Sequence, residues 1–334
     1  MNSNPPERPS PAVLAARGHR RGHSPAQPPG MAHSAETGRT PGYTDVRELG
    51  RSATGRVVLA RPAAPGFPVA IRYLSGEVRR DQRRMAVVRA DVHRLAMLHE
   101  QHLVQVIELV ETPHVTALVT ELADGVNLHT LLKVHNGPLG PQAALTVFRH
   151  ALLGLRAAHG AGVRCGYRPE NVIVDGDGRC RIVVVPSATE PSPPLAHDLY
   201  TAAATCYTCL TGTPPQLGAA TGVPQPRPED VPQGLHRLLL RSLAADPAQR
   251  PQSADELLRD LDRAAEQSLG TGWESTGVAV LALHATLLAD RFPLSTAQNG
   301  RPRALRVALA AAPAAGVALA AILVLTGFGL QACS

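Results

Sequence analysis

The sequence predicts an α+β chain in which a β-rich segment with one helix precedes a helical segment, with a single transmembrane helix near the C-terminus. Three observations lead to this prediction. Apolar runs separated by small turn residues fill residues 45–75, apolar residues recur at helical spacing from about residue 141, and residues 307–330 carry no charge. Such patterns are typical of strands, of amphipathic helices and of a membrane span, respectively.

The N-terminal residues 1–42 are predicted to be disordered. They contain eight prolines and five glycines and show no apolar periodicity, and such a composition does not bury a core. They also hold five arginines against two glutamates, so half of the net charge of +6 lies there. Because no basic stripe with interleaved aromatic residues and no zinc-finger spacing accompanies this charge, we expect no nucleic-acid partner.

The first part of the domain, residues 45–122, is predicted to be mostly strand. Three apolar runs over 45–75 favour three strands, and two further strands are predicted over 104–111 and 115–122. Between them a single helix is predicted over 77–99, because apolar residues recur there at helical spacing. Those residues are Val78, Met85, Val88, Val92, Leu95 and Leu98.

Beyond about residue 141 the pattern becomes helical. One apolar face is formed by Ala144, Phe148, Leu152, Leu155 and Ala158. A hairpin interrupts the helices over 171–185, where Asp-Gly turns separate β-branched runs. Helical spacing resumes near 197–211 and again over 233–265.

Residues 304–330 are predicted to form a transmembrane helix. The uncharged stretch 307–330 would extend roughly 36 Å at ~1.5 Å per residue, enough for a hydrocarbon core of ~30 Å. Arg301, Arg303 and Arg306 precede it, so the positive-inside rule predicts a cytoplasmic N-terminal part and an exterior tail of residues 331–334. A buried alanine-rich helix is the alternative.

The juxtamembrane segment 269–303 contains a second apolar run over 277–289. This run is too short to span a bilayer. We expect it either to pack on the preceding domain or to lie at the membrane surface.

The five cysteines form no dense framework, which favours a reducing compartment. Cys206 and Cys209 form a CxxC within an apolar helical stretch. We interpret them as buried helix cysteines, with a redox or metal pair as the alternative, because no second CxxC completes a zinc site.

Six motifs follow one another between about Tyr43 and about Ala265. They are Gly50–Val57 (GRSATGRV), Val69–Arg72 (VAIR), Glu121–Leu128 (ELADGVNL), Arg164–Asn171 (RCGYRPEN), Asp198–Pro215 and Leu239–Leu257. In this order and spacing, over about two thirds of its length, the chain resembles bacterial Ser/Thr protein kinases of the actinobacterial type. The resemblance implies a bilobal protein-kinase-like fold over residues 43–268. It places a β-rich N-lobe at about 43–120 and a helical C-lobe at about 125–268.

The resemblance also implies which residues stand at the phosphate-binding positions. The glycine-rich loop keeps Gly50 and Gly55, but its middle glycine is Ser52. The third-strand lysine is replaced by Arg72, and its glutamate partner on the helix by Asp91. Arginine differs from lysine in shape and hydration, so this exchange is not conservative. We expect an Arg72–Asp91 ion pair, which would stabilise the N-lobe or hold Arg72 toward phosphate.

The catalytic loop departs further from the family. Gly166 stands where the family has the aspartate that accepts the substrate proton, and Arg168 replaces the helper lysine. Asn171, which would hold one magnesium ion, is kept, whereas Val184 replaces the metal-binding aspartate. A hard divalent cation requires oxygen ligands, which valine lacks. The resemblance therefore implies degenerate catalytic positions and no metal site.

The activation segment is short, because only 11 residues separate Pro186 from Asp198. Glu190 is a candidate for the segment's closing glutamate and would then pair with Arg250. Asp198 is kept, and in the family this residue supports the catalytic loop from below.

The nucleotide pocket is better preserved. Its apolar walls suit an adenine ring, and we expect weak ATP binding that does not depend on a metal. The candidate binding residues are Leu49, Gly50, Gly55, Val57, Ala70, Arg72, Thr120, Glu121, Ala123, Asn171 and Ile173.

These features lead to three functional hypotheses. The first is a membrane-anchored pseudokinase at the cell membrane, with its N-terminal domain in the cytoplasm, that is not an enzyme and serves as a regulatory or docking module. Its expected partners are the membrane and a protein such as an active Ser/Thr kinase, a phosphopeptide reader or a cell-envelope protein. The alternative is a divergent but active Ser/Thr protein kinase that uses Arg72 and Asn171. A third hypothesis is another nucleotide-dependent transferase on the same scaffold.

Overall fold

The computed structural model describes residues 40–52, 55–185, 195–215, 231 and 233–295. The predicted transmembrane helix 304–330, the tail 331–334 and residues 1–39 of the predicted disordered segment lie outside these ranges. Within the described ranges, no helix combines the length and the apolar character that crossing a membrane requires.

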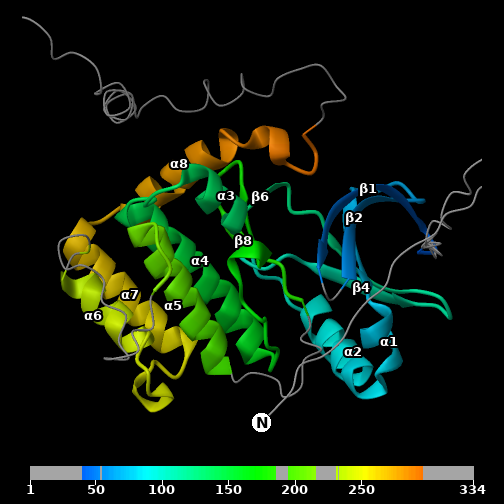
Figure 1. Ribbon diagram of the computed structural model, residues 1–334, viewed down its shortest axis with the longest axis horizontal. Helices are drawn as coiled ribbons and strands as arrows, with labels where there is room; N and C mark the ends of the chain where they lie inside the picture. The colour runs from blue at the N-terminus through cyan, green and yellow to red at the C-terminus, as the bar shows by residue number, and fades with distance from the viewer. Residues whose placement is uncertain (1–39, 53–54, 186–194, 216–230, 232, 296–334) are drawn as a thin grey trace, which may run out of the picture. The chain divides into compact units, whose positions relative to one another are not determined.

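The β-rich lobe is built on a five-stranded antiparallel sheet (Figure 1). Its strands, in spatial order, are β1 (Tyr43–Ser52), β2 (Gly55–Pro62), β3 (Val69–Leu74), β5 (Thr116–Glu121) and β4 (Val106–Glu111). Residues alternate between buried and half-buried along β3, as expected for a strand with one face on a core. Val69, Ile71 and Tyr73 point into that core, so Ala70 and Arg72 face the other side.

Two helices cover the sheet, where the sequence predicted one over 77–99. The first, α1, spans Gly76–Arg80, and α2 spans Gln82–Ala96. The division falls at Asp81, whose side chain accepts hydrogen bonds from the backbone N–H groups of Arg83 and Arg84. Asp81 has an extended backbone and is the N-cap of α2, so a new helix begins there. Apolar periodicity alone does not reveal this break between the two helices.

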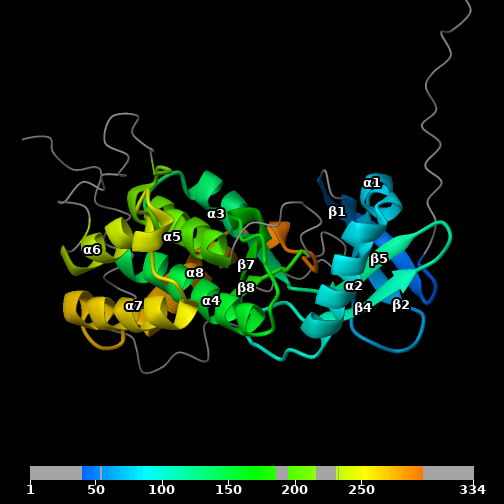
Figure 2. The ribbon, with the colours of Figure 1, turned by 90° about the horizontal axis from the view of Figure 1, so that it is seen from below.

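The helical lobe surrounds α4 (Pro141–Gly160), which packs against three other helices. These are α5 (Leu195–Thr211), α7 (Ala254–Leu269) and α8 (Trp273–Thr286). The other helices are α3 (Leu128–His135) and α6 (Gln233–Ser242), with single turns η1 (Pro169–Asn171), η3 (Pro247–Gln249) and η4 (Ala289–Arg291). A small sheet of β6 (Gly125–Asn127), β7 (Val172–Asp175) and β8 (Cys180–Ile182) includes the predicted hairpin and lies between these helices and the β-rich lobe (Figure 2).

The four cysteines within the described ranges are buried and free. Burial raises the pKa of the Cys206 thiol well above its ordinary value and that of Cys209 to about 12. Both side chains point into the helical core from α5. A thiol without access to water and without thiolate character is unreactive, as expected for structural cysteines.

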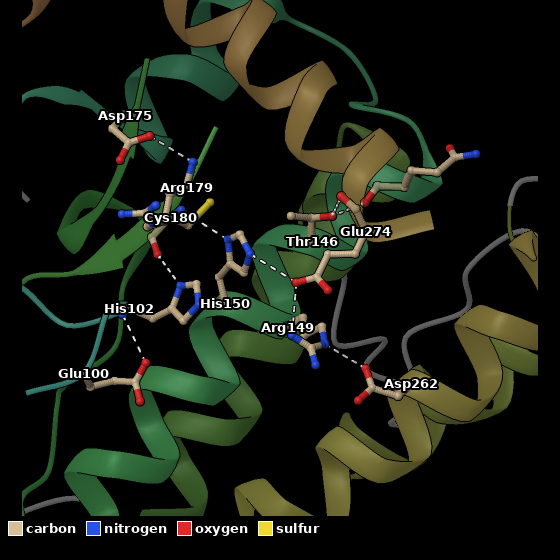
Figure 3. Close-up of polar contacts among 11 residues, drawn as sticks. Glu100, His102, Thr146, Arg149, His150, Asp175, Arg179, Cys180, Asp262 and Glu274 are labelled. Atoms are coloured by element: carbon tan, nitrogen blue, oxygen red, sulfur yellow. Dashed lines mark hydrogen bonds and ion pairs between the residues drawn. The ribbon is translucent and has the colours of Figure 1, made fainter. Parts of the chain in front are cut away.

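The two lobes meet at residues 102–104, which pair with β8. The backbone N–H of Val104 donates to the carbonyl of Ile182 at 2.9 Å, and Ile182 N–H donates to the His102 carbonyl at 2.8 Å. The His102 Nδ1–H donates to the Cys180 carbonyl at 3.0 Å, and the ring stacks on His150 with centroids 4.2 Å apart. Figure 3 shows the two imidazoles side by side between β8 and α4.

We expect the thermal unfolding temperature of the full chain to fall as the pH is lowered from 6.5 toward 4. Burial first, and the neighbouring His150 second, lower the pKa of His102 to about 4. Between that value and the unfolded pKa of about 6.5, only the unfolded chain takes up the proton, so the stabilisation present above pH 6.5 is lost on acidification. The loss is on the order of 3 kcal/mol. His102→Asn, which keeps a donor for the Cys180 carbonyl but does not titrate, should flatten the profile. Identical profiles for the two proteins would contradict this assignment.

Candidate nucleotide-binding and phosphotransfer site

Four of the predicted wall residues of the nucleotide pocket are half-buried, and they come from both lobes. Leu49, Val57 and Ala70 come from the five-stranded sheet, and Ile173 comes from β7 of the small sheet. Strand register places Gly50 opposite Val57, and Val57 opposite Arg72. The structure thus places the predicted wall residues of the five-stranded sheet beside the glycine-rich loop and on β3. Gly55 has a φ of +141°, and a Cβ there would lie 1.8 Å from the Tyr73 carbonyl oxygen, so only glycine fits this turn.

The hinge between the lobes follows β5. Thr120 is buried and pairs with Ala70 across the β3–β5 ladder. The Glu121 carboxylate accepts a hydrogen bond from the Gln105 backbone N–H at 2.7 Å and forms an ion pair with Arg181 of β8. The Glu121 backbone is also paired, because its N–H donates to the Gln105 carbonyl at 3.0 Å and its carbonyl accepts from the Thr120 hydroxyl at 3.1 Å. Glu121 is therefore committed to contacts within the protein. Sequence reasoning missed Arg181, although its position in an alternating strand was the available signal.

Arg72 lies on β3 with its side chain half-buried. Burial lowers the pKa of its guanidinium. Across the described ranges, which omit residues 53–54 of the loop, no ion pair or hydrogen bond involves this side chain. A partly desolvated cation without an anionic neighbour is unfavourable, so an anionic ligand would improve its environment.

The predicted Arg72–Asp91 ion pair is wrong. Asp91 is buried on α2, and its carboxylate binds Arg94 of the same helix at 3.2 Å. Burial raises the pKa of Asp91, and the charges of Arg94 and Arg164 partly oppose this effect. Aspartate is one methylene shorter than the family's glutamate, and a cation one turn away on its own helix is within closer reach than β3.

The catalytic loop is held by Asp198 from α5, as expected from the resemblance. Its carboxylate accepts hydrogen bonds from the backbone N–H groups of Cys165 and Tyr167, both at 2.9 Å, and binds His159 Nε2 at 3.1 Å. Burial alone would raise the pKa of Asp198, but these hydrogen bonds outweigh it and hold the pKa below its ordinary value. The loop backbone on both sides of Gly166 is therefore fixed.

Gly166 adopts a left-handed conformation with a φ of +57°. A Cβ built at this residue would meet no atom within 4 Å, so the space that a side chain would occupy is open. Arg168 is exposed at the N-cap of η1. Asn171 ends η1 with its side chain half-buried, and its carbonyl accepts a hydrogen bond from Val183 N–H at 2.7 Å. The structure thus places Gly166, Arg168 and Asn171 on one loop, in the order of the motif.

Val184 is 2% exposed and packs in the core of the helical lobe. Within the described ranges, no group of three or more His, Cys, Asp or Glu side chains could hold a metal ion. Half-buried apolar residues suited to a base and the half-buried cation Arg72 thus lie on adjoining strands β2 and β3. The protein side chains do not fit a site that holds a divalent cation by themselves, because Asn171 alone supplies a family ligand.

Residues 186–194 and Glu190 lie outside the described ranges, so the predicted Glu190–Arg250 pair stays a prediction. Arg250 itself donates to the Ala244 carbonyl at 2.7 Å and lies over the Tyr200 ring at 4.3 Å.

Comparison with known proteins shows what this chain is similar to. Residues 43–184 match the protein kinase domain model. The serine/threonine-protein kinase PkaB of Streptomyces coelicolor is 30% identical over 259 residues, covering 64% of this chain and 61% of PkaB. PknD of Mycobacterium tuberculosis is 29% identical over 293 residues, covering 74% of this chain and 43% of PknD. Residues 43–184 thus match a protein kinase domain, and the chain is similar to bacterial Ser/Thr protein kinases over about half of their length.

The solved structures agree with the kinase fold. The crystal structure of the Mycobacterium tuberculosis PknI kinase domain matches with a TM-score of 0.58 at 23% identity, covering 69% of this chain and 99% of that domain. The predicted bilobal kinase fold, with a β-sheet N-lobe and a helical C-lobe, is therefore confirmed.

Two expectations about this kinase domain need correction. The prediction that it is catalytically inactive is wrong by this comparison, because the matching relatives are named Ser/Thr protein kinases and no described feature demonstrates inactivity. A kinase domain also implies ATP binding in general, so the expectation of metal-independent binding has no support, since protein kinases use magnesium with ATP.

Proposed function

We propose that residues 43–268 form a divergent Ser/Thr protein kinase, which binds ATP in the interlobe cleft and transfers its γ-phosphoryl group to hydroxyl groups of proteins. The observation that carries this proposal is Arg72, a half-buried cation without an anionic partner within the described ranges, at the family's phosphate-binding position. The matched protein kinase domain and the similarity to named Ser/Thr protein kinases support the reaction type.

The mechanism follows from what the cleft retains. The apolar walls hold the adenine ring and Arg72 binds phosphate oxygens, which places the γ-phosphoryl group against the loop that Asp198 fixes. Phosphoryl transfer depends mainly on positioning and electrostatic stabilisation, with little covalent chemistry for the protein to perform. Magnesium, when bound with ATP, supplies charge neutralisation at the phosphates, and Asn171 is the side chain that would contact it.

The absence of a side chain at Gly166 determines the rate of phosphate transfer that we expect. Without a carboxylate at this position, the proton of the attacking hydroxyl leaves to water as the oxygen–phosphorus bond forms and ADP departs. A positioned base contributes about 10²- to 10⁴-fold, so transfer should be slower by a factor of this order. Incubating the full chain with γ-labelled ATP, magnesium and a Ser/Thr-rich protein acceptor tests the proposal, with label appearing on hydroxyl side chains as the supporting result.

We also propose a cell-membrane location with the kinase domain in the cytoplasm, and a protein partner there. Support comes from the uncharged segment within 304–330 and the three arginines before it. An active Ser/Thr kinase, a phosphopeptide reader and a cell-envelope protein are the partner classes that fit a kinase domain at this place, where it could also serve a regulatory role. Deleting residues 301–334 should move the chain from the membrane pellet to the supernatant, and unchanged pelleting would contradict the anchor.

A further inference from the structure

The last described helix, α8, is fastened to the helical lobe at its N-terminal end by a network of charges. Glu274 binds Arg149 Nη1 at 3.0 Å and lies 3.4 Å from His150 Nε2, both on α4 (Figure 3). Arg149 also binds Asp262 of α7 at 2.9 Å. The contact with His150 is the first cause that lowers the pKa of Glu274, so this carboxylate is charged where it meets α4.

Two glycines let α8 approach its neighbours closely. A Cβ at Gly277 would lie 2.1 Å from Thr146 Oγ1 and 2.3 Å from the Gln142 carbonyl oxygen of α4. A Cβ at Gly178, in the β7–β8 turn, would lie 2.0 Å from the Val278 carbonyl oxygen of α8. These distances leave no room for a side chain at Gly277 or Gly178. The backbone of α8 therefore packs directly against α4 and the small sheet.

Beyond α8, residues 289–295 run across the hinge to the N-lobe. Phe292 is 8% exposed, with its ring beside Gly176 of the β7–β8 turn. The backbone N–H of Leu294 donates to the hinge carboxylate of Asp124 at 2.9 Å. Arg47 of β1 donates to the Pro293 carbonyl at 2.7 Å and to the Phe292 carbonyl at 3.3 Å. Figures 1 and 2 both show this orange segment leaving α8 on the side of β1.

We propose that residues 289–295 act as an interlobe strap that limits how far the nucleotide cleft opens. The strap is seated on the C-lobe through α8 and Phe292, contacts the hinge at Asp124, and holds the N-lobe through Arg47. Arg47 precedes the pocket residues Leu49 and Gly50 on the same strand. Opening the lobes moves β1 away from the hinge, so it must break the Arg47 contacts. The proposal does not depend on phosphotransfer.

The strap is weak enough to be released. A hydrogen bond from a charged donor to a neutral carbonyl contributes modestly to stability, and the Arg47 side chain is exposed to competing water. The strap therefore biases the cleft toward closure without locking it. A pull on the chain after residue 295 would act directly on β1 and on the hinge.

Hydrogen exchange of the full chain, followed by mass spectrometry, tests the strap without nucleotide. Arg47→Leu removes both carbonyl contacts but keeps an apolar stem. We expect amide exchange to rise at least threefold in peptides covering 292–295 and also in the hinge, residues 121–125. Phe292→Ala removes the contact of the strap with the C-lobe, so it should also raise exchange in 292–295 and in 121–125. Exchange in α4 should stay unchanged, because the lobe itself remains folded.

Arg51→Leu is the matched control. Arg51 lies on the same strand and is exposed, and its carboxylate partner Glu48 lies on that strand too, away from the strap. In this control, amide exchange in the peptides covering 292–295 and 121–125 should equal that of the unaltered chain. The proposal is overturned if Arg47→Leu behaves like Arg51→Leu, or if exchange rises only in 292–295 while the hinge stays as protected as in the unaltered chain.

Discussion

Replacing Gly166 by aspartate should raise the rate of phosphate transfer about 10²- to 10⁴-fold, the range that a positioned base contributes. The left-handed backbone at this residue, with a φ of +57°, is one that aspartate tolerates better than most residues. A Cβ there meets no atom within 4 Å, so a side chain can begin at this residue without a clash. The measurement is the initial rate of label transfer from γ-labelled ATP under saturating magnesium.

Gly166→Asn is the control for this gain. Asparagine has nearly the shape of aspartate and the same preference for a left-handed backbone, but it accepts no proton. The strain of a side chain at this φ should lower stability by about 1 kcal/mol in both variants alike. Equal rates for the aspartate and asparagine variants would show that a base at this position does not limit transfer.

Replacing Arg72 by alanine should weaken ATP binding about tenfold or more. A charge-assisted hydrogen bond contributes about 1.5–3 kcal/mol, and Arg72 is the cation that the strand register places in the cleft opposite Val57. The guanidinium is partly desolvated and has no anionic partner within the described ranges, so its removal should leave the unfolding temperature unchanged or raise it. Isothermal titration and thermal unfolding together measure both effects.

Arg72→Lys separates charge from shape. Lysine restores the residue type of the family and should keep most of the affinity that alanine loses. An alanine variant that binds ATP like the unaltered chain would remove Arg72 from the phosphate site. An alanine variant that unfolds at a much lower temperature would instead show that Arg72 has a structural partner.

Local sequence patterns predicted much of the fold. The alternation over 69–74 and the Asp-Gly turns over 171–185 corresponded to β3 and to the β7–β8 hairpin. These features depend on neighbouring residues, and so a single sequence reveals them. The motif resemblance likewise located Asp198 beneath the catalytic loop, because motif spacing carries tertiary information that periodicity lacks.

Side-chain partners and long-range contacts were harder to predict. Asp91 forms its ion pair with Arg94 and not with Arg72. Sequence spacing alone does not show which of these two cations lies closer to the carboxylate. The Arg181–Glu121 pair joins residues 60 positions apart, and Arg47 meets Pro293 from 246 positions away. The docking of α8 depends on glycines that permit close backbone contact. An apolar stripe in the sequence does not show which helix or strand α8 packs against.

The central claim is that this cleft performs slow, ATP-dependent phosphate transfer. The most direct measurement is a single-turnover reaction of the full chain in excess over γ-labelled ATP with magnesium, with the Arg72→Ala chain alongside. We expect label on serine or threonine side chains at a slow but measurable rate, and we expect the Arg72→Ala chain to show a rate reduced in parallel with its ATP affinity. Absence of transfer with magnesium and with manganese, from a chain that demonstrably binds ATP, would contradict it.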